Sequence, residues 1–260
     1  MEEHGLAPAQ RRDVLLSVGA VAALSLLAWL ALVRMARSMA ATDTMAAMGM
    51  PSSSPWAAAD LLQLWVMWAV MMAAMMLPST IPVVLLFARV GRQREARGEP
   101  APRLLLLLAG YLVVWIGFSL VAALAQQALR TAALITPAMA FGRPVVAACL
   151  LFTAAAYQWS PPKQACLRVC RSPLSMFISE WREGWTGALR MGARHGMFCV
   201  ACCWLLMLLL FVAGVMNLAW VGVLAALVLV ERTLPGGAWL GRVAGIGFVL
   251  WGAWLLLRTS

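Results

Sequence analysis

Residues 195–207, HGMFCVACCWLLM, put a histidine, three cysteines and two methionines into a strongly apolar run. Residues three and four positions apart share one face of a helix. If this segment is helical, a single stripe contains His195, Cys199, Cys202, Cys203, Leu206 and Met207. The pattern therefore predicts a membrane-spanning helix with thiol, thioether and imidazole groups along one face.

The composition of the whole chain is typical of an integral membrane protein. Of its 260 residues, 63% are hydrophobic and 12% are charged, and the mean hydropathy is +0.86. Soluble domains carry roughly 45–50% apolar and about 25% charged residues. The net charge of +10 comes from Lys and Arg residues between apolar runs, which in a membrane protein is a topology signal. We therefore predict the lipid bilayer as a partner and no nucleic acid.

Apolar runs predict an all-α, polytopic transmembrane helix bundle. A hydrocarbon core about 30 Å thick needs roughly 20 apolar residues of helix, and lipid-exposed backbone must satisfy its own hydrogen bonds. The fourth and sixth runs are short, so we predict about seven spans, with six as the alternative count. The runs lie near 14–33, 62–87, 104–125, 143–159, 197–216, 218–231 and 239–257.

The distribution of Lys and Arg predicts the orientation. Fifteen of the 20 basic residues fall on one side if the chain starts in the cytoplasm and crosses seven times, as the positive-inside rule requires. This arrangement is that of a multi-pass membrane protein. We expect a cytoplasmic tail, 1–13, and a single transmembrane domain, 14–257, whose first run is too long for a cleaved signal peptide.

Two loops of this topology carry sulfur. An outer loop, 34–60, is rich in methionine, and its thioethers are a candidate surface for acquiring metal. A cytoplasmic loop, 160–196, contains two cysteines. Its second half spaces Phe, Ile, Trp and Leu among charged residues, which predicts an interfacial helix.

The second span, MWAVMMAAMMLPS, carries a second group of sulfur atoms. Met71 and Met75 lie one helical turn apart, as do Met72 and Met76, so two adjacent stripes of thioether cover about half of the helix surface. From the helical rise of about 1.5 Å per residue, these sulfurs reach a depth similar to that of the fifth span. Pro78 is expected to kink the helix and free backbone carbonyls. Methionine also fills apolar cores, so packing stays open as the alternative.

A third element, YQWSPPKQACLRVCRSP, places Cys166 and Cys170 one turn apart below the fourth span. Nearby positive charge lowers the pKa of a thiol and favours thiolate, so the pair is predicted to be reactive or metal-binding. A joint site with the base of the fifth span is one arrangement. The neighbouring basic residues are Lys163, Arg168 and Arg171.

The remaining polar residues of the spans have simpler interpretations. Cys149 stands alone and is assigned to packing. Glu231, beside Arg232, is expected to pair or to reach the membrane interface. Asp60 and Asn217 are expected to cap or hydrate the ends of helices.

Sulfur ligands favour Cu(I), and zinc is the alternative metal when fewer thioethers take part. Copper, as Cu(I), is therefore the predicted ion. The candidate ligands are His195, Cys199, Cys202, Cys203, Met207, Cys166, Cys170, Met71, Met72, Met75 and Met76.

Four stretches in this order resemble a bacterial family: MWAVMMAAMMLPS, YQWSPPKQACLRVCRSP, GARHGMFCVACCWLLMLLLFVAGVMNLAW and LVLVERTLP. The family is described as predicted metal-binding integral membrane proteins, domain of unknown function 2182, and the resemblance covers about residues 60–257. The family tends to have glycine in place of Ala201 and lysine in place of Arg232, and neither difference removes a proposed ligand. The resemblance supports the same cysteine, histidine and methionine positions without saying which of them bind metal.

Three function classes follow from these features. The first is a Cu(I) carrier, chaperone or assembly factor, with a metallochaperone or a metalloenzyme subunit as partner. The second is a membrane thiol–disulfide or metal-dependent oxidoreductase that exchanges electrons with a quinone. The third is an accessory subunit whose sulfur atoms only pack. Sulfur dominates and oxygen ligands are scarce, which favours copper handling; no catalytic residue is predicted.

Overall fold

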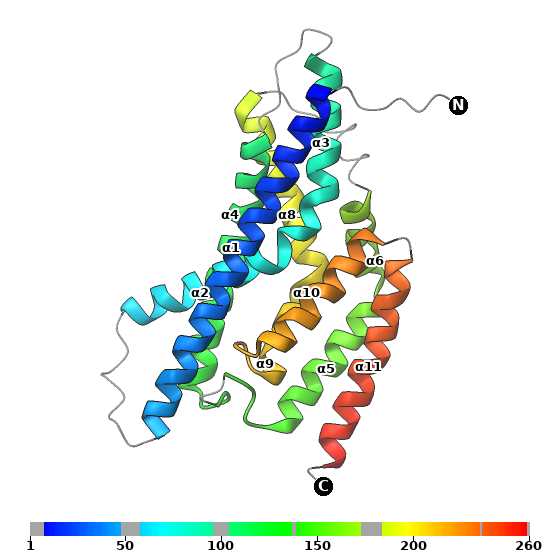
Figure 1. Cartoon of the computed structure of the whole chain (residues 1–260). Coiled ribbons are helices and arrows are strands. Elements are labelled where there is room, and N and C mark those ends of the chain that lie inside the picture. The colour runs from blue at the N-terminus through cyan, green and yellow to red at the C-terminus, as the bar shows by residue number, and fades with distance from the viewer. Residues whose placement is uncertain are drawn as a thin grey trace.

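The computed structural model is a bundle of helices (Figure 1) and describes residues 8–47, 58–95, 104–136, 139–172, 184–234 and 236–258. Within these ranges the chain forms helices and no strand beyond one isolated bridge between Ile135 and Phe141. The predicted all-α class is therefore confirmed for this part of the chain.

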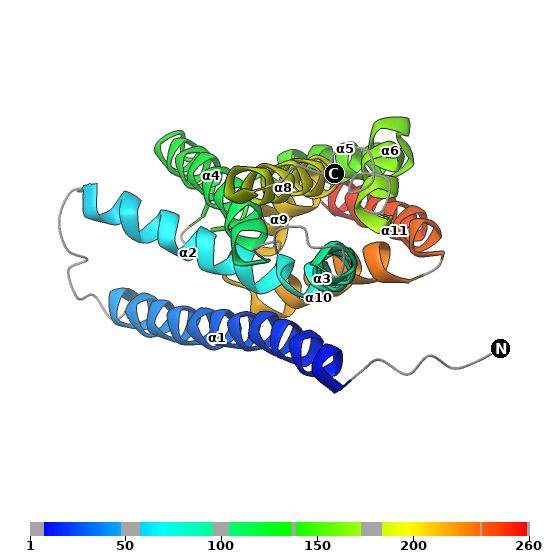
Figure 2. The same ribbon diagram turned by 90° about the horizontal axis from the view of Figure 1, so that it is seen from above.

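The helices pair in a simple pattern. α4 packs along α8, α5 packs along α11, and α2 lies between α1 and α4. Seen from above, α1 runs along one edge of the bundle, beside α2 (Figure 2). The elements are α1 (Pro8–Ala47), α2 (Ala58–Met76), the 3-10 helix η1 (Pro78–Thr80), α3 (Ile81–Glu95), α4 (Leu104–Thr131), α5 (Pro144–Trp159), α6 (Pro161–Arg171), α8 (Gly184–Leu208), α9 (Leu210–Ala213), α10 (Leu218–Thr233) and α11 (Gly237–Leu257).

Four helical segments of the described chain are long and apolar enough to cross a membrane: Val18–Ser38, Leu104–Thr131, Gly184–Ala213 and Gly237–Leu257. A fifth is formed if Asp60–Met76 and Pro78–Gly91, bent by 44°, make one span. α5 and α10 have 16 residues each, fewer than the roughly 20 that a bilayer core takes. The predicted count of seven is therefore not confirmed.

The two sulfur-bearing loops differ from the expectation at their helix boundaries. α1 continues to Ala47, so helix occupies the first half of the segment 34–60. Ala, Met and Arg are good helix formers, and no Gly or Pro interrupts them before Gly49. The side chains of the methionines predicted as an acquisition surface lie outside the described residues, except that of Met35.

The first part of the predicted interfacial helix, 173–183, lies outside the described residues. Its second part, 184–196, forms the first turns of α8, which begins at Gly184. Helix-forming Ala, Leu, Met and Arg residues run from there into the apolar stretch without a proline. His195 therefore lies near the middle of a 25-residue helix and not at its base.

The backbones of α4 and α8 touch at two glycines. A methyl group on Gly110 or on Gly192 would overlap a backbone carbonyl of the opposite helix. Small residues allow this close approach between helices in membranes. The approach brings Tyr111 of α4 beside His195 and Cys199 of α8.

Candidate metal centre

Three cysteines of α8 lie on its buried face. Cys199, Cys202 and Cys203 are 0%, 2% and 1% exposed. His195 and Met207, at the two ends of the predicted stripe, are buried as well. The stripe therefore faces the inside of the bundle along its whole length.

The guanidinium of Arg232, near the end of α10, lies among these three thiols. Its Nη1 donates to Sγ of Cys199 at 2.7 Å, and its Nη2 donates to Sγ of Cys202 at 3.1 Å. The Sγ atom of Cys203 is 3.5 Å from Nη2. Arg232 is only 6% exposed, so a full positive charge is buried against three sulfur atoms.

Two hydroxyl groups complete the surroundings of this charge. Ser79 Oγ accepts a hydrogen bond from Arg232 Nη1 at 3.0 Å, and the Tyr111 hydroxyl lies 2.9 Å from Cys199 Sγ. Both hydroxyls also donate to the carbonyl of Met76, at 2.8 Å from Ser79 and 3.4 Å from Tyr111. The bend expected at Pro78 is present, and the Met76 carbonyl just before it accepts from both groups.

Among the described residues, Arg232 forms no ion pair with a carboxylate. Its neighbour Glu231 pairs with Lys163 of α6, with Nζ 2.9 Å from Oε2. Gln158 hydrogen-bonds both members of this pair, and Gly241 leaves room for the carboxylate, which an added methyl group would overlap. Glu231 thus pairs as predicted, but with a buried lysine and away from the neighbouring arginine.

α6 packs against α8 and brings a fourth thiol to the group. The Cys170 thiol is buried and hydrogen-bonds to that of Cys202. This hydrogen bond and burial raise the pKa of Cys170. Cys170 therefore joins the α8 cysteines, whereas Cys166 does not.

Cys166 is partly buried and lines a cavity together with residues of α8. Burial raises the pKa of the Cys166 thiol, so the prediction that nearby basic residues lower it is wrong. The Lys163 ammonium turns to Glu231, and Arg171 donates to the carbonyl of Leu234. Lys163 and Arg171 are therefore directed to partners other than the thiol.

His195 is linked to the thiols through Tyr111. Its ring stacks on that of Tyr111, with centroids 5.8 Å apart, while the Tyr111 hydroxyl meets Cys199. Within the described part of the chain, Nδ1 of His195 has no hydrogen-bond partner. The ring borders a cavity of about 10 Å³, close to the least volume that holds one water molecule.

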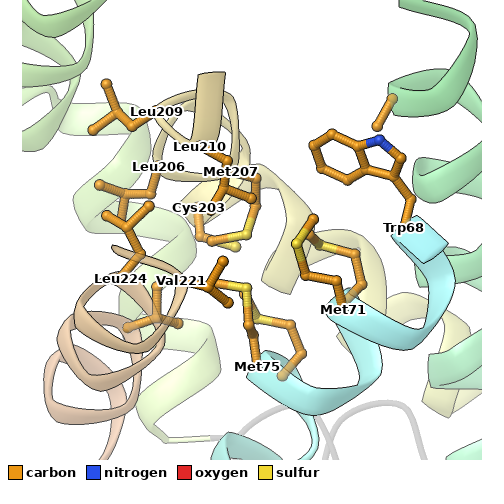
Figure 3. Packing of buried hydrophobic residues seen from close by; sticks show 14 of the residues in the cluster. Trp68, Met71, Met75, Cys203, Leu206, Met207, Leu209, Leu210, Val221 and Leu224 are labelled. Atoms are coloured by element: carbon orange, nitrogen blue, oxygen red, sulfur yellow. The ribbon is translucent and has the colours of Figure 1, made fainter. Parts of the chain in front are cut away.

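The methionines of α2 meet the sulfurs of α8. Met71, Met72, Met75 and Met76 are fully buried in the same cluster as the α8 cysteines. Figure 3 shows the side chains of Met71 and Met75 pointing toward those on α8. The sulfur groups of α2 and α8 therefore pack in one buried cluster, while their matching depth in a membrane stays a prediction.

The described residues form no group of three or more His, Cys, Asp or Glu side chains arranged to hold a metal ion. The guanidinium of Arg232 fills the space between the thiols. The donors around it are thiols and thioethers, which suit Cu(I), whereas structural zinc sites are closed tetrahedra of cysteine and histidine.

A family model described as PpoB2, copper chaperone, matches residues 65–255. The chain belongs to this family. The match supports the copper-related part of the resemblance seen in the sequence, while the name of domain of unknown function 2182 stays a prediction. Comparison with curated proteins and with solved structures gave no match.

Some residues of the candidate metal centre, all within the region matched to the PpoB2 family, were not predicted from the sequence. Arg232, Tyr111 and Ser79 all contact the thiol group or its arginine. One signal was present: a charged residue at the end of an apolar run must find a partner in the bundle. The residues next to Arg232 in the sequence do not identify this partner.

Proposed function

We propose that this protein is a membrane-embedded Cu(I) chaperone whose cargo is held by the thiols of Cys199, Cys202 and Cys203. The observation that carries the proposal is the buried guanidinium of Arg232, which has three thiols and no carboxylate around it among the described residues. Thiols lose their protons when they bind a metal. A Cu(I) ion with two or more thiolates is therefore an anionic group.

A buried charge is costly unless an opposite charge or strong hydrogen bonds compensate it. The guanidinium supplies this compensation to an anionic copper–thiolate group, and the group supplies it to the guanidinium. Arginine suits this role because its fixed fork of donors stays charged. Loading requires Arg232 to yield the space between the sulfurs while remaining beside them.

Neighbouring soft groups extend the site. Cys170 reaches Cys202 from α6, and Met207 continues the stripe on α8. His195 supplies an unpartnered ring nitrogen nearby. A chaperone has to release its cargo, and adjacent soft ligands allow exchange between sulfur atoms. Cys166 lies outside this group.

The proposed location is the bacterial inner membrane. α5 and α10 would cross as short spans beside the four or five longer ones, and the start of α1 and the end of α11 lie at opposite ends of the bundle (Figure 1). The Lys and Arg distribution then places the N-terminus in the cytoplasm. A metalloenzyme subunit is the proposed recipient of the copper.

The test is the copper content of detergent-purified protein after exposure to copper under reducing conditions. We expect Cys202→Ser/Cys203→Ser to lose the stoichiometric copper of the wild type. The matched control is Cys149→Ser, an exposed cysteine outside the thiol group, which keeps it. Equal losses in both variants, or no copper in the wild type, would contradict the proposal.

A second candidate function is thiol redox exchange, which the contact between Cys170 and Cys202 from different helices favours. Disulfide formation there would remove two electrons and two protons, which a quinone accepts. Alkylation and mass spectrometry after quinone treatment measure it. Protection of both thiols from alkylation in copper-free protein would support redox exchange over copper handling, provided that Cys202 loses this protection in Cys170→Ser.

A further inference from the structure

A cavity of about 170 Å³ lies between α1, α2 and α4, away from the thiols. Met35, Met67 and Met139 all line it. Met67 and Met139 are 3% and 4% exposed and form its buried part, while Gln63 is exposed at its rim. Three methionines from three separate segments thus line one hollow.

Met139 is held in place by more than apolar packing. Its sulfur accepts a hydrogen bond from Nε2 of Gln126 at 3.2 Å, and Gln126 in turn accepts from Nε1 of Trp68 at 2.6 Å. Its φ is 58°, in the left-handed region that non-glycine residues seldom adopt. Such strain persists where the surrounding structure fixes it, often at binding sites.

A row of buried methionines on α2 leads from the cavity toward the thiol group. Met67, Met71 and Met75 follow one another at single helical turns along α2 and span roughly 12 Å at 1.5 Å per residue. All three are buried in the cluster that contains Cys203 and Met207. In Figure 3, Met71 and Met75 are directed toward these two residues of α8.

We propose that the methionine-lined cavity is a second Cu(I) site, formed by Met35, Met67 and Met139, from which copper reaches the thiols past Met71 and Met75. This inference rests on the proposed function and adds the place where the cargo enters. Thioethers bind soft metal ions without losing a proton. They hold Cu(I) less tightly than thiolates, so the transfer of Cu(I) to the thiols of α8 has a favourable free energy.

The charged residues of the cavity suit a monovalent cation. Asp60, in the first turn of α2, and Arg130, in the last turn of α4, both line it. Their opposite charges leave no net positive field there to exclude Cu(I).

The experiment titrates detergent-purified full chain with Cu(I), anaerobically, against a chromogenic Cu(I) chelator. Leucine replaces methionine at nearly constant volume, so the variant is Met67→Leu/Met139→Leu, made in the wild type and in the Cys202→Ser/Cys203→Ser background. Met191→Leu is the matched control, because Met191 is buried but packs in a different cluster.

In the Cys202→Ser/Cys203→Ser background we expect the tight thiol site to be lost and one weaker Cu(I) site to remain in the titration. The methionine changes should lower the affinity of this weaker site at least about tenfold. Met191→Leu leaves it unchanged. If the cysteine variant binds no copper, or the methionine changes have no effect on it, the cavity is not a site although the proposed function stands. A wild type that binds no copper overturns the proposed function itself.

The route is tested by the rate at which the thiols take Cu(I) from the chelator. Met71→Leu/Met75→Leu is expected to slow this rate and leave the final copper content unchanged. An unchanged rate removes the route.

Discussion

Lys163 and Arg232 are both buried cations, and they lie on different sides of α10 with different partners. Lys163 faces a carboxylate and an amide, from Glu231 and Gln158. Arg232 faces three thiols and a hydroxyl. Glu231 and Arg232 are consecutive in sequence, yet consecutive helical residues point about 100° apart. α10 therefore supplies Glu231 as the counter-charge of Lys163 and carries the buried charge of Arg232 itself.

The difference separates a structural charge from a functional one. The opposite charges of Lys163 and Glu231 compensate each other, so the pair joins α6 to α10 and requires no further counter-charge. The partners of Arg232 are neutral as thiols and become negative when a metal replaces their protons. If the proposed function holds, the nature of the counter-charge, more than burial, distinguishes a cation that stabilises the fold from one that serves the bound metal.

The largest expected effect comes from breaking the ion pair between Lys163 and Glu231. Glu231→Gln keeps the shape of the side chain but leaves Lys163 buried without its counter-charge. Removing one partner of a buried ion pair costs about 3–5 kcal/mol, so thermal unfolding followed by tryptophan fluorescence should show a clearly lower Tm.

Copper content per folded chain is the control for this variant, and it should stay at the wild-type value. If Glu231→Gln lost copper with an unchanged Tm, the assignment of this pair to structure would be wrong.

The second prediction concerns Arg232. Arg232→Met fills similar space without charge, so the copper–thiolate group loses its compensation. We expect Cu(I) affinity to fall about ten- to a hundredfold, which corresponds to about 1.4–2.8 kcal/mol. Chelator competition measures the change.

Arg232→Lys is the matched variant, because it retains the charge without the fork of donors. It should keep most of the affinity. Equal losses in the two variants would show that geometry matters more than charge.

A smaller effect is expected from Tyr111→Phe, which removes the hydroxyl beside Cys199 and leaves the ring that stacks on His195. A typical hydrogen bond contributes about 0.5–1.5 kcal/mol to stability, so Tm should fall only slightly. Copper affinity should change less than in Arg232→Met. A greater loss than that would make Tyr111 a direct participant in binding.

The smallest effect concerns reactivity at the edge of the site. Because burial raises the pKa of Cys166, its thiol stays protonated at neutral pH. Its alkylation should therefore reach half its maximal rate at a higher pH than the value of about 8.5 usual for free cysteine. Mass spectrometry of the Cys166 peptide, with a free cysteine derivative as reference, follows this rate. A midpoint below that of the reference would restore a role for the neighbouring basic residues.

Much of the architecture could be predicted because it depends on local patterns. Apolar runs gave helices, Pro78 gave a bend, and spacing of three and four residues put the cysteines of α8 on one buried face. Each of these follows from residues within a few turns of one another. The extent of α1 was underestimated, because a methionine- and alanine-rich segment favours helix as well as loop.

The contacts of the site could not be predicted in the same way. Arg232 meets Cys199 across 33 positions and Ser79 across 153, so each contact depends on how separate helices rotate and pack. The same limit explains the wrong expectation at Cys166. Proximity in sequence suggested that the basic residues act on the thiol, but tertiary packing directs Lys163 to a carboxylate across 68 positions.

The bend between α2 and α3 is connected to Arg232 through the side chain of Ser79. Ser79 lies in η1, immediately after Pro78, and holds both the Met76 carbonyl and the guanidinium of Arg232. A change in the 44° angle would swing Ser79 relative to α8 and draw the guanidinium along or let it go. The position of the guanidinium between the sulfurs is thus tied, through one hydroxyl group, to the angle between α2 and α3.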